Sequence, residues 1–248
     1  MIRLENVTKT FGTGASAVID LTLSIDKGEF VFMVGPSGSG KTTFLRLLIR
    51  DMVPSKGSIF LGDWDITKLP NSKVPYLRKR IGVVFQDLKM LMDRTIFENI
   101  MLPLEMANVD AKVARQQVEQ ILEQVGILEH KDKFPVQLSG GELQRAAIAR
   151  ALVFSPEILL ADEPTGNLDT TTSWEIVKLL QDINALGTTV IMATHNTDIV
   201  NSLLKRVITL NKGALEKDEK PKGHHEKKES TAVRQEKKED PVKSGEEK

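Results

Sequence analysis

Short stretches in which apolar and polar residues alternate open the chain. Residues 2–7 and 18–25 both alternate, which is typical of strands that bury one face. A turn at residues 26–28 closes the second stretch, so we expect a small antiparallel sheet near the start of the chain. Residues 57–61 and 63–65 have the pattern of a hairpin. The first quarter of the chain is therefore predicted to be rich in antiparallel β-structure.

Other short runs are apolar throughout, which is the pattern of strands buried inside a sheet. These runs are residues 30–34, 81–85, 158–162 and 188–193. Residues 43–49 and 143–152 consist of good helix formers and follow or precede such runs. The chain as a whole is therefore predicted to have an α/β fold.

One further helix is indicated between Asp110 and Gly126, which are suited to cap its two ends. Its apolar residues lie on one stripe at helical spacing. They are Val113, Val118, Ile121, Leu122 and Val125. We interpret this stripe as core packing.

Residues 88–92, Leu-Lys-Met-Leu-Met, are apolar without the period of a strand or a long helix. Packing inside the protein is one interpretation. The alternative is a surface for a partner, because methionine side chains adapt well to a bound surface.

Composition excludes several classes of protein. The 248 residues have no net charge and no cysteine, so neither a strong field for nucleic acid nor a disulfide framework is expected. No apolar run has the length of a membrane span, and the N-terminus does not resemble a signal peptide. We therefore expect a cytosolic protein whose membrane role, if any, depends on a partner.

The composition changes at residue 216. Residues 216–248 contain acidic and basic residues in equal number and few large apolar ones, so we expect a disordered tail. His224 and His225 lie in it without further metal ligands nearby, which favours a solvated tail over a metal site. The predicted globular domain is residues 1–215.

The clearest chemical motif is Gly35-Pro-Ser-Gly-Ser-Gly-Lys41-Thr42, a Walker A sequence between a predicted strand and a predicted helix. Backbone N–H groups of such a loop point at phosphate oxygens, Lys41 reaches the β- and γ-phosphates, and the Thr42 hydroxyl can bind Mg²⁺. A glycine-rich turn that matches by chance would lack these flanks. The predicted ATP-binding residues here are Gly35, Pro36, Ser37, Gly38, Ser39, Gly40, Lys41, Thr42 and Thr43.

Polar residues follow the predicted strands where a ligand crevice is expected in α/β folds. Asp162 and Glu163 end an apolar run as in a Walker B element, so Asp162 is predicted to hold Mg²⁺ and Glu163 to act as general base. Gln86 directly follows the apolar run at residues 81–85. His195 follows residues 188–193, and we favour a contact with the γ-phosphate over a purely structural role.

Two further positions have two interpretations each. Ser139, Gly140 and Gly141 begin a predicted helix, which is either an anion-binding helix start or a plain capped helix. Phe11 lies in a glycine-containing turn, where it either stacks on a nucleotide base or packs against the protein.

Taken together, these motifs resemble those of ATP-binding cassette (ABC) ATPases. The resemblance covers residues 1–215 and rests on the order of Walker A, Gln86, Leu138-Ser-Gly-Gly-Glu142, Walker B, Gly166-Asn-Leu-Asp169 and His195. It implies a P-loop NTPase fold with a RecA-like core, an antiparallel β-subdomain and an α-helical subdomain at roughly residues 87–155. It also implies ATP and Mg²⁺ as ligands.

The resemblance further implies a homodimer that encloses two ATP molecules. Ser139, Gly140, Gly141 and Glu142 would bind the γ-phosphate held by the other copy, and Asp169 would couple the two sites. Gln86 would contact Mg²⁺ and the attacking water and connect to a membrane partner. Phe11 would stack on adenine.

Several phrases, among them Arg94-Thr-Ile-Phe-Glu-Asn99, are similar to the FtsE-type subfamily of bacterial cell-division ATPases. That likeness implies an integral membrane partner of FtsX type, a place on the inner face of the cell membrane, and a role in switching on peptidoglycan hydrolases. Lipoprotein and macrolide exporters share some of these phrases and remain the alternative. DNA-repair and ribosome-acting ATPases do not fit, because a coiled-coil insertion and a second cassette are both missing.

The chain departs from the family pattern at three places. Phe11 replaces a commoner tyrosine, Leu143 replaces a glutamine, and the charged tail is additional.

Overall fold

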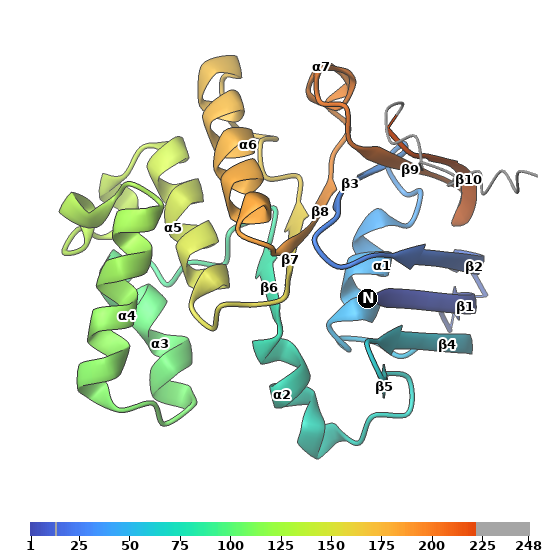
Figure 1. Ribbon diagram of the computed structural model, residues 1–248, viewed down its shortest axis with the longest axis horizontal. Coiled ribbons are helices and arrows are strands. Elements are labelled where there is room, and N and C mark those ends of the chain that lie inside the picture. The colour runs from blue at the N-terminus through green and yellow to red at the C-terminus, as the bar shows by residue number, and fades with distance from the viewer. Residues whose placement is uncertain (13, 222–248) are drawn as a thin grey trace, which may run out of the picture.

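The computed structural model describes residues 1–12 and 14–221, which form two sheets with helices around them (Figure 1). The smaller sheet is antiparallel, with strand order β2-β1-β4-β5. Its strands are β1 (Ile2–Thr10), β2 (Ser16–Ile25), β4 (Lys56–Leu61) and β5 (Trp64–Asp65). Buried and exposed residues alternate over residues 2–5 of β1 and 21–25 of β2, and β4 pairs with β5, so the predicted half-buried strands and the hairpin are confirmed.

The larger sheet has the order β10-β9-β3-β8-β7-β6 and is parallel except for the edge strand β10. Its strands are β3 (Phe30–Val34), β6 (Ile81–Val84), β7 (Ile158–Asp162), β8 (Thr189–Ala193), β9 (Arg206–Asn211) and β10 (Ala214–Glu219). Every residue of β7 and β8 is buried, which explains why these runs are apolar throughout.

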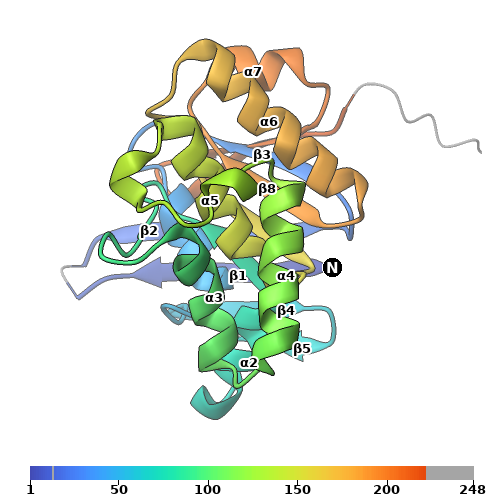
Figure 2. The ribbon, with the colours of Figure 1, turned by 90° about the vertical axis from the view of Figure 1, so that its left-hand side faces the viewer.

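Helices cover both faces of the larger sheet. Helix α1 (Lys41–Leu48) lies between the two sheets, while α6 (Thr170–Ala185) and α7 (Thr197–Ser202) lie at the opposite face (Figure 1). A separate group of helices stands beside β6 (Figure 1), and Figure 2 shows this group facing the viewer. That group is α3 (Ile96–Met106), α4 (Ala111–Gln124) and α5 (Gly140–Leu152), all within residues 87–155. The remaining elements are α2 (Val74–Lys79) and the short 3₁₀ turns η1 (Asn71–Lys73), η2 (Leu128–His130) and η3 (Pro135–Gln137).

The alternation of side chains along β3 divides the interior into two cores. Phe30 and Phe32 pack with the helical group and α6, whereas Val31 and Met33 pack with α1 and the smaller sheet. This central strand leads directly into the Walker A loop, so the loop is anchored from both sides.

The structure corrects the predicted apolar stripe of α4. Val113 is 53% exposed, and Ala114 is buried in its place with Val118, Ile121 and Leu122. The reason is helical geometry, because Ala114 lies four residues before Val118 and Val113 lies five before it. Asp110 caps the helix as predicted, accepting bonds from the N–H groups of Lys112 and Val113.

A strand also continues four residues beyond the domain boundary expected at residue 215. Strand β10 continues to Glu219 and pairs with β9, and Asp218 forms two hydrogen bonds of 2.7 Å with the buried Arg206 guanidinium. Composition alone could not predict that the strand continues, because the charged Asp218 is stabilised by Arg206, a partner on another strand. The rest of the predicted tail, with His224 and His225, lies outside the described residues.

Candidate active site

The Walker A loop connects β3 to α1 and passes close to neighbouring backbone. A Cβ atom at Gly35 would lie 2.2 Å from the Leu210 carbonyl oxygen, and one at Gly40 would lie 2.3 Å from that of Ala17. Both glycines also have positive φ angles, 150° and 106°. Only glycine fits these two positions, so the motif's glycines set the shape of the loop.

The Lys41 side chain lies inside the loop rather than in solvent. It is 8% exposed, and its ammonium donates to the carbonyl oxygens of Gly35 at 2.8 Å and Pro36 at 3.2 Å. The loop therefore holds a positive charge next to its own free N–H groups. That arrangement suits a phosphate group.

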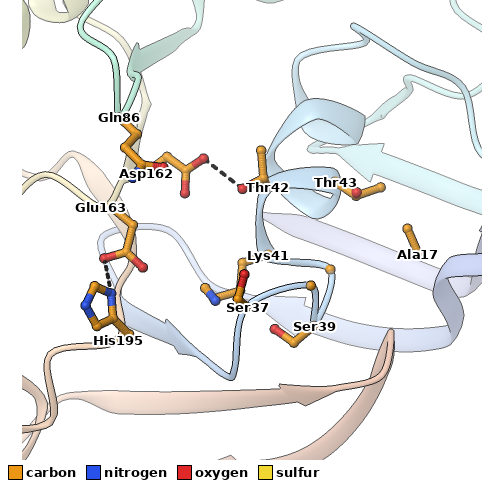
Figure 3. Close-up of a pocket in the computed structure, with 12 residues that line it drawn as sticks. Ala17, Ser37, Ser39, Lys41, Thr42, Thr43, Gln86, Asp162, Glu163 and His195 are labelled. Atoms are coloured by element: carbon orange, nitrogen blue, oxygen red, sulfur yellow. Dashed lines mark hydrogen bonds and ion pairs between the residues drawn. The ribbon is translucent and has the colours of Figure 1, made fainter. Parts of the chain in front are cut away.

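A pocket of about 610 Å³ opens over the loop (Figure 3). It brings together residues from four parts of the sequence that were singled out separately. Its lining is Ala17, Ser37, Gly38, Ser39, Gly40, Lys41, Thr42, Thr43, Gln86, Asp162, Glu163 and His195. Ala17 is the one lining residue that the sequence motifs did not indicate, because a single alanine in a strand carries no local signal.

Oxygen donors meet at one end of the pocket. The Thr42 hydroxyl donates to Asp162 Oδ2 at 3.0 Å, and Gln86 lines the same pocket from the loop after β6. Burial raises the pKa of the Asp162 carboxyl above its ordinary value, and the bond from Thr42 partly opposes that shift. Oxygen ligands of this kind are the ones that Mg²⁺ prefers, so the donor set fits a magnesium ion.

Glu163 and His195 face the phosphate side of the pocket from adjacent strand ends (Figure 3). Nδ1 of His195 lies 2.9 Å from Oε2 of Glu163. The Glu163 side chain is largely buried, whereas that of His195 is 72% exposed. Glu163 has a left-handed backbone, with φ of +49°, and its N–H donates to the Ala193 carbonyl oxygen. The chain thus bends sharply after β7 and turns this carboxylate toward the pocket.

The motif Leu138-Ser-Gly-Gly-Glu142, called the signature below, lies elsewhere on the same chain. Ser139, Gly140, Gly141 and Glu142 line a second hollow of about 280 Å³ together with Asp169, and it shares no lining residue with the Walker A pocket. Ser139 is the N-cap of α5, and Asp169 is the N-cap of α6. A Cβ at Gly141 would lie 2.5 Å from the Thr172 methyl group, so glycine there allows α5 and α6 to touch.

Phe11 is not among the residues that line the Walker A pocket. Its ring is 41% exposed in the turn between β1 and β2, with the Lys9 ammonium 5.8 Å from the ring centre. Both interpretations of Phe11 therefore stay open in this structure.

The apolar segment 88–92 divides between interior and surface. Met90 is buried and Leu88 packs against the core, whereas Leu91 and Met92 are exposed. Neither Leu91 nor Met92 lines a neighbouring groove, which runs along β6 between α1, α2 and α5. This β6 groove consists of two adjoining hollows of about 460 and 520 Å³, lined among others by Val83, Phe85, Lys89 and Phe154. Of residues 88–92, Lys89 alone lines it.

A loop with this shape, opening onto carboxylates at the end of a parallel sheet, defines a nucleotide-triphosphatase cassette. The model of the family described as ABC transporter matches residues 18–166. The chain therefore belongs to the ABC transporter family, and it is an ATPase of that type.

Within this family, the chain is similar to several cell division ATP-binding proteins named FtsE. The chain is 45% identical over 219 residues to the cell division ATP-binding protein FtsE of Bacillus subtilis, covering 88% of this chain and 96% of that protein. It is 47% identical over 220 residues to the FtsE of Mycobacterium tuberculosis, with coverage of 88% and 96%. FtsE of Escherichia coli strain K12 is 45% identical over 215 residues, with coverage of 87% and 97%.

Solved structures agree on the fold. The ATP-binding cassette MJ0796, in a dimeric post-hydrolysis state bound to ADP and Pi, has a TM-score of 0.82 and 35% identity, covering 90% of this chain and all of that one. The cbiO1 protein of Clostridium perfringens, part of the ABC transporter complex cbiONQ, has a TM-score of 0.82 and 30% identity, with coverage of 89% and 88%. The predicted family, fold class and ATPase activity are confirmed.

Proposed function

We propose that this chain is the ATP-hydrolysing subunit of a cell-division complex in which two copies enclose two ATP molecules and move an integral membrane partner of FtsX type. The observation that carries the proposal is that the Walker A loop and the signature line two separate hollows. The Walker A pocket and the signature hollow share no residue, so one chain provides two half-sites. The likeness to FtsE proteins supports the cell-division role.

ATP binding is assigned to the loop between β3 and α1. Its N–H groups and the enclosed Lys41 ammonium would bind the β- and γ-phosphates, with Ser37, Ser39 and Thr43 beside them. On ATP binding, Lys41 would exchange its bonds to two loop carbonyls for stronger bonds to phosphate oxygens. Phe11 would stack on the adenine from the β1–β2 turn.

Thr42, Asp162 and Gln86 would hold Mg²⁺ through their oxygen atoms. When bound, the ion would supply positive charge that offsets the negative charge developing on the phosphates during transfer. It would also supply the positive charge that the buried Asp162 carboxylate needs in order to stay ionised.

Hydrolysis is assigned to Glu163 with His195. The Glu163 carboxylate would accept a proton from the water that attacks the γ-phosphorus, while the bond from that phosphorus to the leaving ADP oxygen breaks. The exposed edge of His195 would contact the γ-phosphate, and its Nδ1 would orient the carboxylate. The sharp bend of the backbone at Glu163 suits this role, because it fixes the direction of the side chain.

In the dimer, Ser139, Gly140, Gly141 and Glu142 of one copy would face the γ-phosphate held by the other. Asp169 would lie between the two sites, since it lines the signature hollow and begins the helix that follows the Walker B strand. Solved cassettes of this fold are dimeric, which supports the arrangement.

The β6 groove is the proposed docking place for the membrane partner. Its first hollow combines apolar side chains such as Val83 and Phe154 with the basic Arg78, Lys79, Lys89 and Arg150 and a single carboxylate, Asp51, while Gln86 lines its second hollow. An amphipathic helix with acidic residues would fit these two features. The chain would thus lie on the cytoplasmic side of the membrane through its partner. In the part of the chain that the structure describes, no helix has the length and apolarity of a membrane span.

Affinity capture tests the partner directly. A tagged Glu163→Gln chain is expressed in the organism that makes the protein. Membranes are solubilised with and without ATP, and the proteins that bind the tagged chain are identified by mass spectrometry. We expect an integral membrane protein of FtsX type, enriched when ATP is present. Recovery of an exporter permease instead would contradict the cell-division role and support the exporter alternative.

A further inference from the structure

The signature serine is tied to a histidine that the motifs did not indicate. Nε2 of His130 lies 2.9 Å from Oε1 of Glu142. The other oxygen of that carboxylate, Oε2, accepts bonds of 2.7 Å from both the N–H and the hydroxyl of Ser139. A continuous chain of contacts therefore runs from His130 in η2, through Glu142, to Ser139 at the start of α5.

These contacts fix the protonation and direction of the groups. Oε2 of Glu142 accepts both bonds from Ser139, and Oε1 lies next to the His130 ring nitrogen, so the carboxylate acts as an acceptor toward Ser139. The bonds from Ser139, followed by the charges of His130 and Lys133, lower the pKa of Glu142 below its ordinary value. The Ser139 hydroxyl has a single proton, and it points at Glu142. A negative charge is thus placed directly beside the atom that would meet a γ-phosphate.

A carboxylate next to an incoming phosphate is unfavourable unless a positive charge offsets it. The charged groups around His130 are Glu142 on α5, Glu129 on η2 with its Oε1 3.8 Å from Nε2, and Lys133 just beyond η2. Lys131 is paired with Glu119 on α4 at 2.8 Å and is not available to Glu142. His130 is the partner in direct contact with Glu142, and its side chain is largely buried.

The position also connects the signature to the helical group. The N–H of Lys133 donates to the carbonyl oxygen of His130, and the N–H of Ile96 donates to the carbonyl oxygen of Lys133. A change at His130 would therefore be transmitted to the start of α3 as well as to Ser139.

We propose that His130 is a positioning residue for the signature, which acts on Ser139 through Glu142 and, when protonated, supplies the charge that allows the γ-phosphate of a second copy to approach. The inference rests on the proposed function, because it assumes that the signature meets ATP across a dimer. Histidine is the side chain that changes charge between about pH 5 and 8. ATP-dependent dimerisation should consequently be stronger near pH 6 than near pH 8.

The test measures the dimer dissociation constant by analytical ultracentrifugation at saturating Mg-ATP, at pH 6 and pH 8, in a Glu163→Gln background that slows hydrolysis. His130→Gln keeps an N–H donor for Glu142 but cannot become charged. Glu142→Gln removes the carboxylate. Lys131→Gln is the matched control, since it removes a positive charge from the next residue, which faces Glu119 instead.

We expect the parent and Lys131→Gln chains to dimerise roughly two- to fivefold more tightly at pH 6 than at pH 8, the range for a change of one charge pair near the surface. His130→Gln should lose most of this difference and resemble the parent at pH 8. Glu142→Gln should dimerise tightly at both pH values and be insensitive to a second change at His130. Because titration of the ATP phosphates affects all variants alike, the comparison between variants isolates His130.

Two outcomes would overturn the inference, and they differ in what they mean for the proposed function. If His130→Gln has the same pH dependence as the parent, His130 does not act on the signature, while the ATP dimer itself stands. If no variant dimerises with ATP at either pH, the proposed dimer is wrong, and the inference falls with it.

Discussion

Two neighbouring carboxylates at the end of β7 have different surroundings and therefore different chemistry. Asp162 is buried and accepts a bond from the Thr42 hydroxyl, which suits a residue that holds a metal ion. Glu163 has a left-handed backbone and lies 2.9 Å from His195, on the phosphate side of the pocket. A single peptide bond thus separates the proposed metal-binding residue, Asp162, from the proposed general base, Glu163.

The first prediction at the residue scale concerns Glu163. Glu163→Gln should keep Mg-ATP binding and lower the turnover by about 10²- to 10⁴-fold, because general-base catalysis contributes a factor of that order. Steady-state phosphate release measures turnover, and equilibrium binding of a fluorescent ATP analogue measures affinity. Glu105→Gln, an exposed change on α3, is the control. Turnover near that of the wild type would exclude Glu163 as the base.

The second prediction concerns Lys41. The loop encloses the Lys41 ammonium through bonds to two carbonyl oxygens. Among the residues that line the pocket, Lys41 is the one lysine or arginine. Lys41→Ala should weaken ATP binding and abolish hydrolysis, since the point charge on the β- and γ-phosphates is lost. Titration with the fluorescent analogue measures the first effect, with the exposed Lys27→Ala as control. An unchanged affinity would mean that phosphates bind elsewhere.

At the element scale, β10 is attached to the sheet by charge as well as by backbone pairing. Arg206 on β9 is buried and binds both oxygens of Asp218 on β10, and its other amino group contacts Glu29 before β3 at 2.9 Å. Three segments that are distant in sequence therefore meet at one guanidinium. Bidentate pairs of this kind are among the stronger charged contacts.

This pair predicts a dependence of stability on pH. The bond to Arg206 lowers the pKa of the Asp218 carboxyl in the folded protein, so the pair stabilises the fold above about pH 4 and the contribution is lost as the pH falls through the lowered pKa. Asp218→Asn should destabilise the protein by about 1–2 kcal/mol at pH 7. Below pH 4 the difference from the wild type should shrink. Urea unfolding at pH 7 and pH 3 measures both, and a difference that is equal at the two pH values would contradict the argument.

The β6 groove joins the helical group to the nucleotide site. Arg150 of α5 lines it and donates to the carbonyl oxygens of Leu88 and Lys89, two and three residues after Gln86. Leu88 and Lys89 have left-handed backbones, a conformation that the Arg150 bonds help to hold. A shift of Gln86 would consequently move the groove and α5 together.

A charged residue in the groove should separate docking from catalysis. Phe154→Glu should prevent recruitment of the chain to membranes that contain the partner, because it removes an apolar contact and repels an acidic helix. Basal ATPase activity of the folded chain should change little. The melting temperature is measured alongside, because Phe154 is partly buried and packs against the core. Val113→Glu, on the exposed face of α4, is the matched control. Full recruitment of a stable Phe154→Glu chain would contradict docking in this groove.

At the scale of the whole molecule, the two proposed phosphate-binding elements lie in separate hollows. The Walker A pocket contains the loop, the carboxylates and His195, whereas Ser139 and its glycines lie in the hollow between α5 and α6. A dimer in which each copy supplies one element to the other would complete two sites at once. The dimeric cassettes with the same fold agree with such an arrangement.

Mixing two damaged chains tests this arrangement. Lys41→Ala and Ser139→Arg chains, each inactive alone, should form heterodimers in which one composite site is intact and the other carries both defects. ATPase activity plotted against the mixing ratio should therefore pass through a maximum near equal amounts. If each chain instead used its own signature, every site would carry a defect, and the mixture would recover no activity beyond the sum of its parts.

The sequence by itself determined the features that depend on neighbouring residues. These features are local patterns. They are the Walker A loop, the apolar strands at whose ends Gln86, Asp162 and His195 lie, and the capped helix at Ser139, and the strands lie in the predicted places. The reason is that loop shape, strand burial and helix capping depend on residues a few positions apart.

Tertiary structure decided the features that depend on residues brought together by packing. Ala17 lines the nucleotide pocket, Arg206 binds Asp218 in a segment that composition assigned to the tail, and His130 reaches Glu142. The separation of the two phosphate-binding elements likewise follows from how α5 and α6 lie against the sheet. No local pattern encodes such contacts, because an unpaired charge or a single small residue looks the same in a sequence whether or not the fold provides its partner.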